Sequence, residues 1–288
     1  MKTILIQFDT DPHPSSFDRI VAVDAGADEH FSYGGMTPAN VTDLVHGAIF
    51  TRGPKDLHNT AIFVGGSNVQ AGEALYEAVG RAFFGPMKVS VMMDSNGCNT
   101  TASAAVVAAK AQLDLKGASA IVLGGTGPVG QRAAELLAME GCDVTVVSRS
   151  VDRATAVCKN VEATNVAGHL NPAAASSPED VMAACADKQV LIAAGAAGIC
   201  FLPKGSLTDL PDLRIAIDLN AVPPLGLADV GVADKAQSIG DTIVYGALGV
   251  GTTKMKVHKQ AIARLFKTND ATLSTREIYQ IALEVAGQ

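Results

Sequence analysis

The chain alternates short apolar runs with longer segments in which apolar side chains recur every three or four residues. Apolar runs at residues 4–8, 61–64 and 89–93 predict three β-strands, because each is short and ends at a turn or a polar cluster. Helices are predicted from Ser15 onward and over residues 69–83. Strands that alternate with helices predict a parallel sheet with right-handed crossovers.

A second series of the same kind follows an alanine-rich helix predicted over residues 101–115. Its predicted elements are strand 120–124, helix 128–140, strand 143–147, helix 151–160, strand 189–193 and strand 214–218. Two further helices are expected at residues 253–267 and 274–286. We therefore expect an α/β fold with two α/β domains, the second a Rossmann-type doubly wound parallel sheet.

The predicted domain boundary lies at the alanine-rich helix. Residues 1–100 are expected to form the first domain, joined by the last helix at about residues 268–288. Residues 101–267 are expected to form the second. A length of 288 residues allows two domains, and 48% hydrophobic against 18% charged residues predicts a buried core rather than disorder.

The most specific motif is the glycine-rich segment at residues 124–130, Gly-Gly-Thr-Gly-Pro-Val-Gly. Gly125 is expected to make a tight turn, and Gly127 to let the backbone approach a diphosphate. Gly130 would let the following helix pack close to the strand. A glycine-rich turn with a purely structural role is the alternative. The apolar strand before it and the amphipathic helix after it favour a dinucleotide site.

The helix that follows this turn adds to the same interpretation. Pro128 suits the first helical turn, where a missing N–H costs nothing, and the helix N-terminus would face the diphosphate. We include Thr126 and Val129 among the expected coenzyme contacts.

The end of the second strand of this domain indicates which coenzyme binds. An NAD enzyme usually has Asp or Glu there, to hold the ribose 2′-hydroxyl. This chain has Ser148, Arg149 and Ser150, with Arg153 one turn later. Arginine and serine can hydrogen-bond a 2′-phosphate that a carboxylate would repel, so NADP is the predicted cofactor. A solvated arginine at a helix start is the alternative.

Two later turns also have the character of a coenzyme site. Ala194 and Gly195 follow the strand at 189–193 and lack bulk, so they could admit the nicotinamide ribose. Asn220 lies at the carboxyl end of the strand at 214–218, where open α/β sheets bind ligands. Both segments could equally be packing turns.

Charge and composition exclude several classes of protein. A net charge of −7 argues against nucleic-acid binding through phosphates, and no apolar run is long enough for a membrane span. Five scattered cysteines without a CxxC pair predict reduced thiols in the cytoplasm. The six histidines show no ligand spacing, so no metal site is expected.

Nine segments, in order along the chain, carry a resemblance to a known family: residues 7–11, 51–53, 61–66, 83–86, 94–97, 99–101, 125–130, 223–226 and 245–249. Together they resemble the NADP-dependent methylene-tetrahydromethanopterin and methylene-tetrahydrofolate dehydrogenases of one-carbon metabolism. The resemblance covers essentially the whole chain. The segment 151–188 is not distinctive, and Thr252 and Thr253 depart from the aliphatic or glycine residues of relatives.

The resemblance implies a pterin-binding first domain, an NADP-binding second domain and a cleft between them. It also implies a homo-oligomer, either a trimer or a dimer of trimers. The expected reaction converts methylene-tetrahydromethanopterin to methenyl-tetrahydromethanopterin, with hydride passing to NADP. A methylene-tetrahydrofolate dehydrogenase, a shikimate-type NADP dehydrogenase and a non-catalytic NADP-sensing protein are the alternatives.

Polar clusters at the ends of two predicted strands supply candidates for binding the reduced pterin substrate. These residues are Asp9, Thr10, Asp11, Asp94, Ser95, Asn96, Asn99, Thr100 and Thr101. Helix capping and turn formation are the alternative roles for each of them. Lys254 and Lys256 are expected at the start of a helix, where cations oppose the helix dipole. By resemblance, Lys254 is the expected substrate-positioning lysine, and Asp94 and Thr101 are further catalytic candidates.

Overall fold

The computed structural model describes all residues, 1–288, and divides into two compact units. The first comprises Met1–Thr100 with Met255–Gly287, and the second comprises Thr101–Lys254 with the final residue. Each unit has its own sheet, parallel in the first unit and parallel except for one strand in the second, so the predicted α/β class is confirmed. The chain returns to the first unit at Met255, inside helix α8 (Ala247–Leu265), rather than near residue 268.

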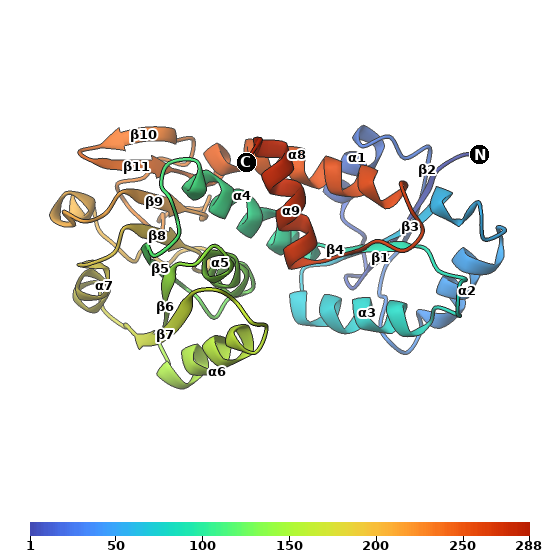
Figure 1. Ribbon diagram of the computed structural model, residues 1–288, viewed down its shortest axis with the longest axis horizontal. Coiled ribbons are helices and arrows are strands. Elements are labelled where there is room, and N and C mark those ends of the chain that lie inside the picture. Colours follow the sequence, from blue (N-terminus) through green and yellow to red (C-terminus); the bar gives the residue numbers. More distant parts are fainter. The chain divides into compact units, whose positions relative to one another are not determined.

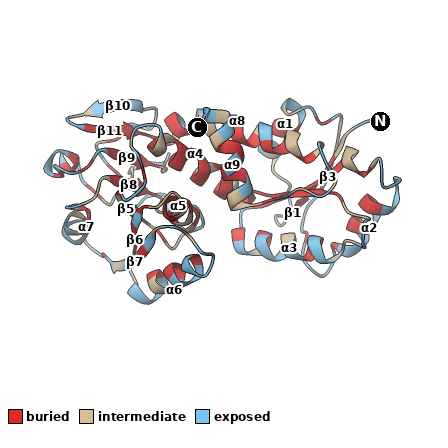
Figure 2. Cartoon of the chain, in the orientation of Figure 1, coloured by how far each residue is buried: buried red, intermediate tan, exposed pale blue.

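The first unit contains a five-stranded parallel sheet in the order β12-β4-β3-β1-β2 (Figure 1). Its strands are β1 (Ile4–Asp9), β2 (Glu29–Tyr33), β3 (Thr60–Gly65), β4 (Ser90–Met93) and β12 (Thr272–Leu273). The central strands β3 and β4 are buried along their whole length, which matches the uninterrupted apolar runs of the sequence (Figure 2). The sequence did not predict β2, an edge strand with half-exposed residues.

Helices cover both faces of this sheet. They are α1 (Ser16–Asp24), α2 (Thr42–Phe50), α3 (Val69–Arg81), the later part of α8, and α9 (Thr275–Ala286). Figure 1 shows α2 and α3 on one face and α1 and α8 on the other. The helix predicted after Ser15 is confirmed, because the Ser15 hydroxyl accepts a hydrogen bond from the Asp18 N–H at 3.3 Å and caps α1.

The second unit contains a seven-stranded sheet in the order β10-β11-β9-β8-β5-β6-β7. Its strands are β5 (Ser119–Leu123), β6 (Asp143–Ser148), β7 (His169–Ala174), β8 (Val190–Ala193), β9 (Ile215–Asp218), β10 (Lys235–Ile239) and β11 (Thr242–Tyr245). Only β10 is antiparallel. From β5 the chain first adds β6 and β7 on one side, then β8, β9 and β11 on the other. The sheet is doubly wound, as predicted, with its switch point between β5 and β8.

The helices assigned wholly or mainly to the second unit are α4 (Cys98–Lys110), α5 (Pro128–Met139), α6 (Val151–Glu162) and α7 (Pro178–Cys185). Helix α4 begins three residues before the predicted start at 101, because the Asp94 carboxylate caps its first turn. Residues Asn99 and Thr100 therefore belong to a helix and not to a loop.

Helix α8 also begins earlier than predicted, at Ala247 instead of residue 253. Gly249 and Gly251 both lie inside the helix. A Cβ on Gly249 would lie 1.8 Å from the carbonyl oxygen of Asp234, so this glycine permits close backbone packing. Lys254 therefore lies about two turns from the helix start, where the helix dipole no longer acts on it.

All five cysteines are free thiols, and only Cys200 is exposed. Burial raises the pKa of Cys142 and Cys185 to about 12 and that of Cys158 to about 11. These thiols therefore remain protonated near neutral pH. No helix of the structure combines the length and the apolar character that crossing a membrane requires.

Candidate functional site

A tight glycine turn joins β5 to α5 at the carboxyl edge of the second sheet. Gly124 adopts a left-handed conformation with φ +70°, and a Cβ there would lie 2.8 Å from the Ala194 carbonyl oxygen. The sequence assigned this turn to Gly125. Gly125 instead provides packing space, because its Cβ would lie 2.7 Å from a methyl group of Val146 on the neighbouring strand.

The two remaining glycines bring α5 close to this turn. A Cβ on Gly130 would lie 2.4 Å from the Gly124 carbonyl oxygen, which is the close helix–strand contact that the sequence indicated. Gly127 is the N-cap of α5 and makes no side-chain cap hydrogen bond, and Pro128 opens the helix. The N–H groups of the first turn are therefore available to an anion, and the helix dipole favours one.

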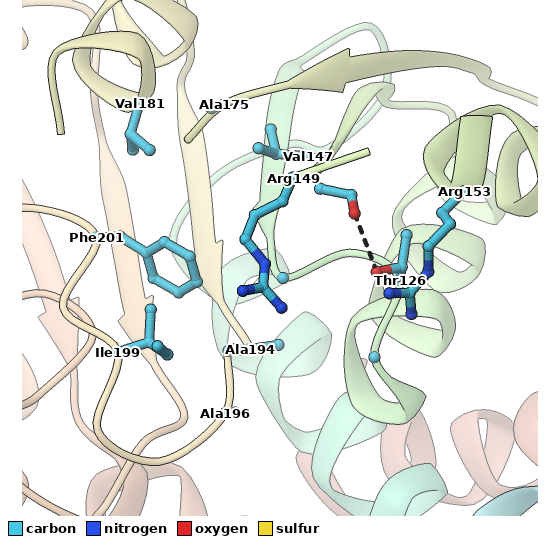
Figure 3. Close-up of a pocket in the computed structure, with 14 residues that line it drawn as sticks. Thr126, Val147, Arg149, Arg153, Ala175, Val181, Ala194, Ala196, Ile199 and Phe201 are labelled. Atoms are coloured by element: carbon cyan, nitrogen blue, oxygen red, sulfur yellow. Dashed lines mark hydrogen bonds between the residues drawn. The ribbon is translucent and has the colours of Figure 1, made fainter. Parts of the chain in front are cut away.

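A pocket of about 270 Å³ opens beside this turn, and its lining residues come entirely from the second unit (Figure 3). The predicted coenzyme residues that line it are Thr126, Gly127, Ser148, Arg149, Arg153, Ala194 and Gly195. The predicted residues Gly125, Pro128, Val129, Gly130, Ser150 and Asn220 do not line it. The first four of these shape the turn and α5, and Ser150 is the N-cap of α6.

The polar end of the pocket lies where β6 meets α6. The Thr126 and Ser148 hydroxyl oxygens are 3.3 Å apart, and the Ser150 hydroxyl accepts a hydrogen bond from the Arg153 N–H. Arg149 and Arg153 are exposed, and both line the pocket (Figure 3). No acidic side chain lines the pocket. This end is therefore suited to a phosphate group.

The pocket also has an apolar lining that was not predicted from the sequence. It consists of Val147, Ala175, Val181, Ile199 and Phe201 (Figure 3). A Cβ on Gly195 would lie 2.5 Å from the Phe201 ring, so this residue lacks a side chain because the ring packs against it. An apolar wall of this kind suits the planar faces of an adenine.

Asn220 makes hydrogen bonds within the loop after β9. Its side-chain amide donates to the Pro224 carbonyl at 3.0 Å, and its side-chain oxygen accepts from the Val222 N–H. Asp218 accepts from the N–H groups of Asn220 and Leu227, and burial raises the pKa of its carboxyl group. Both residues therefore hold the loop after β9 in shape.

The carboxyl edge of the first sheet holds the predicted pterin residues. Asp9 is fully buried and accepts hydrogen bonds from the Gln7 amide and from the N–H groups of Asp11 and Ser15. Asp11 accepts two hydrogen bonds from Ser67, from its N–H and its hydroxyl. These carboxylates fix the loops after β1 and β3.

Asp94 lies between β4 and α4, and its carboxylate also accepts several hydrogen bonds. Its carboxylate accepts from the N–H groups of Asn99 and Thr100 and, at 2.6 Å, from the Thr100 hydroxyl. Asp94 is only 1% exposed, so this network starts α4 in the interior of the protein. Ser95 donates to the Gly65 carbonyl, which ties this loop to the end of β3.

Four other predicted residues are differently placed. Asn96 is exposed and left-handed, with φ +52°, and Thr101 is half-buried in α4. Lys254 and Lys256 are two positions apart on α8, about 200° around its axis, so their side chains leave on different faces. Lys254 is half-buried and Lys256 is exposed.

Two family models match the chain, one in each half. Residues 16–96 match the N-terminal domain of methylene-tetrahydromethanopterin dehydrogenase, and residues 106–232 match shikimate/quinate 5-dehydrogenase. Over 289 residues the chain is 44% identical to the "Bifunctional protein MdtA" of Methylorubrum extorquens, covering 99% of both chains. It is 31% identical to the "NAD(P)-dependent methylenetetrahydromethanopterin dehydrogenase" of the same organism, covering 96% of both.

The chain belongs to the methylene-tetrahydromethanopterin dehydrogenase family. The matched N-terminal segment of this family contains the ends of β3 and β4 with Asp94 and Ser95, and the second match contains the whole glycine turn. The similar solved structures support only the fold, because their sequence identity to this chain is low. A shikimate 5-dehydrogenase from Listeria monocytogenes aligns with TM-score 0.56 at 14% identity, covering 97% of this chain and 96% of that one.

The structure also shows whether side chains that commonly bind metal ions lie close together. No three or more His, Cys, Asp or Glu side chains lie together in a way that could hold a metal ion.

Proposed function

We propose that this protein is an oxidoreductase of one-carbon metabolism that oxidises methylene-tetrahydromethanopterin to methenyl-tetrahydromethanopterin with NADP. The observation that carries the proposal is a pocket with a glycine turn, two arginines and no carboxylate, in a member of this dehydrogenase family. When bound, NADP supplies the hydride acceptor. The relative at 31% identity is named as NAD(P)-dependent.

The second unit would bind the coenzyme by its own groups. The N–H groups at the start of α5 would hold the diphosphate. Arg149 and Arg153 would bind the 2′-phosphate. The Thr126 and Ser148 hydroxyls lie at the same end of the pocket. Phe201 and Ile199 would pack against the adenine.

The proposed reaction places few demands on acid–base groups. Removing hydride from a carbon between two nitrogens leaves a cation that those nitrogens stabilise, and no proton moves. The protein has to hold the two reacting carbons in contact and exclude water. A site without a nucleophile–base pair is therefore compatible with the activity.

We propose different roles for the buried and the partly exposed residues among the predicted pterin contacts. Asp9, Asp94, Asn99 and Thr100 are buried and shape the edge of the sheet. Among the residues that retain exposure, Asp11, Asn96, Thr101 and Lys254 are proposed pterin contacts. Thr10, whose buried hydroxyl has no hydrogen-bond partner, is a further one. Lys254 would hold the pterin electrostatically and orient it.

We further propose that the protein is a cytoplasmic homo-oligomer. Five free cysteines fit a reducing compartment. Exposed apolar side chains on the first unit, including Ile20, Val23 and Phe84, are of the kind that oligomer interfaces cover. Sedimentation equilibrium tests the oligomeric state, and a monomer at micromolar concentration would refute the proposed homo-oligomer.

A turnover assay tests the function. Purified protein is given NADP with methylene-tetrahydromethanopterin, methylene-tetrahydrofolate or shikimate, and NADPH formation is followed at 340 nm. We expect turnover of methylene-tetrahydromethanopterin. Activity only with methylene-tetrahydrofolate would change the substrate, and activity only with shikimate would refute the reaction class. Coenzyme binding without turnover of any substrate would indicate an NADP-sensing protein.

A further inference from the structure

A buried histidine on α8 lies among side chains of α1 and β3. The His258 ring is fully buried and stacks on Phe63 of β3, with ring centroids 5.7 Å apart and an interplanar angle of 24°. On another side it packs against Phe17 of α1 at 6.2 Å. The three rings therefore link α8 to α1 and to the sheet of the first unit.

The same histidine faces a carboxylate. Its Nε2 lies 4.0 Å from an oxygen of Asp18 in the first turn of α1, whose side chain is 16% exposed. The other Asp18 oxygen lies 3.6 Å from the point where a Cβ on Gly65 would be. Asp18 thus lies between His258 and the carboxyl end of β3.

Packing alone does not explain why this position is a histidine. A leucine would bury a similar apolar area without the cost of removing an imidazole and a carboxylate from water. Buried polar pairs of this kind contribute little to net stability, but they restrict how two helices can pack. The pair therefore points to a need for fixed geometry.

The pair bears on the position of the Lys254 side chain. Lys254 precedes His258 by four residues on one continuous helix, so the two side chains leave α8 on the same face, one turn apart. Rotation or sliding of α8 would move Lys254 with it. Holding the His258 ring between Phe63, Phe17 and Asp18 prevents such a movement.

We propose that His258 and Asp18 are positioning residues for the reaction, and that the pair fixes α8 so that the Lys254 ammonium meets the pterin in one orientation. This inference rests on the proposed function. It assigns no proton transfer to His258, and it predicts that the two residues act through Lys254.

The test combines His258→Leu and Asp18→Asn with Lys254→Ala. Each of the first two variants is expected to lower kcat/KM for the pterin about tenfold, with unchanged NADP binding by fluorescence titration. Because removing one partner of a buried pair also lowers stability, both are measured well below the unfolding midpoint of each variant. In the Lys254→Ala background the further loss from His258→Leu should shrink to less than about twofold, because the group that it positions is gone. His258→Gln, which retains a hydrogen-bond donor, should recover part of the loss.

Asp24→Asn is the matched control. Asp24 pairs with Lys259 at 2.7 Å and so also joins α1 to α8, but on the surface, and its loss should leave kcat/KM within about twofold. Multiplicative losses from His258→Leu and Lys254→Ala would overturn the inference, as would an equal effect of Asp24→Asn. Absence of wild-type turnover with either reduced pterin would instead refute the proposed function.

Discussion

The hydroxyl oxygens of Thr126 and Ser148 lie 3.3 Å apart and join the glycine turn to the end of β6. A carboxylate at the end of β6 would bind the 2′-hydroxyl of NAD, whereas this end carries two hydroxyls and two arginines. We therefore expect NADP to be used at least about tenfold more efficiently than NAD, a difference of about 1.4 kcal/mol.

Arg149→Ala should raise the KM for NADP far more than the KM for NAD, because only NADP carries the 2′-phosphate. Steady-state kinetics with both coenzymes measures this. Lys159→Ala is the control, since Lys159 is an exposed cation on α6 that does not line the pocket. Equal losses with both coenzymes would show that Arg149 does not contact the 2′-phosphate.

Gly127 and Gly130 should respond differently to alanine. A Cβ at 127 would lie 3.3 Å from the Gly124 carbonyl oxygen, so Gly127→Ala should leave the fold intact and weaken coenzyme binding at least about tenfold, about 1.4 kcal/mol. At 130 the distance is 2.4 Å, so Gly130→Ala should destabilise the protein by about 1–3 kcal/mol. Coenzyme titration and thermal unfolding separate the two effects. Unchanged coenzyme affinity in Gly127→Ala would mean that the turn is only structural.

Lys254 should act without exchanging a proton. If the chemical step is bare hydride transfer, its rate should change little between about pH 6 and 8. Lys254→Ala should lower activity strongly at every pH, and Lys254→Arg should recover only part, because a guanidinium differs in shape from an ammonium. A steep ionisation in single-turnover measurements that vanished in Lys254→Ala would make the lysine an acid–base group.

Asp94 should contribute chiefly to stability. Asp94→Ala removes the acceptor of three hydrogen bonds at the start of α4, so we expect destabilisation of about 2 kcal/mol or more. Urea unfolding measures this value. Asp43→Ala, which removes an exposed carboxylate from the first turn of α2, is the control. A large loss of pterin turnover at unchanged stability would assign Asp94 a direct role.

The sequence predicted helices and strands well where a continuous apolar run or a helix-capping serine marked them. The buried strands β3, β4 and β5 read as continuous apolar runs, and Ser15 and Ser274 marked the starts of α1 and α9. Local composition did not predict edge strands. Pro172 lies within β7, which is tolerated only because β7 is the last strand of its sheet.

Long-range packing accounts for what the sequence could not predict in the site. Gly195 looked like an opening for the coenzyme, but its missing side chain accommodates the Phe201 ring. Phe201 lies in a loop with no periodic pattern, so no local signal places it in the pocket wall. No local sequence signal marks His258 either, because its neighbours Phe63 and Asp18 are distant in the sequence.

Cys200 stands in the chain between Ile199 and Phe201, two residues that line the coenzyme pocket. It is the single exposed thiol, and the high pKa values of Cys142, Cys158 and Cys185 keep those three buried groups protonated. A maleimide dye should therefore attach at one site in the native chain. The protein thus offers its own attachment point for a fluorescent reporter of coenzyme occupancy, without an engineered cysteine.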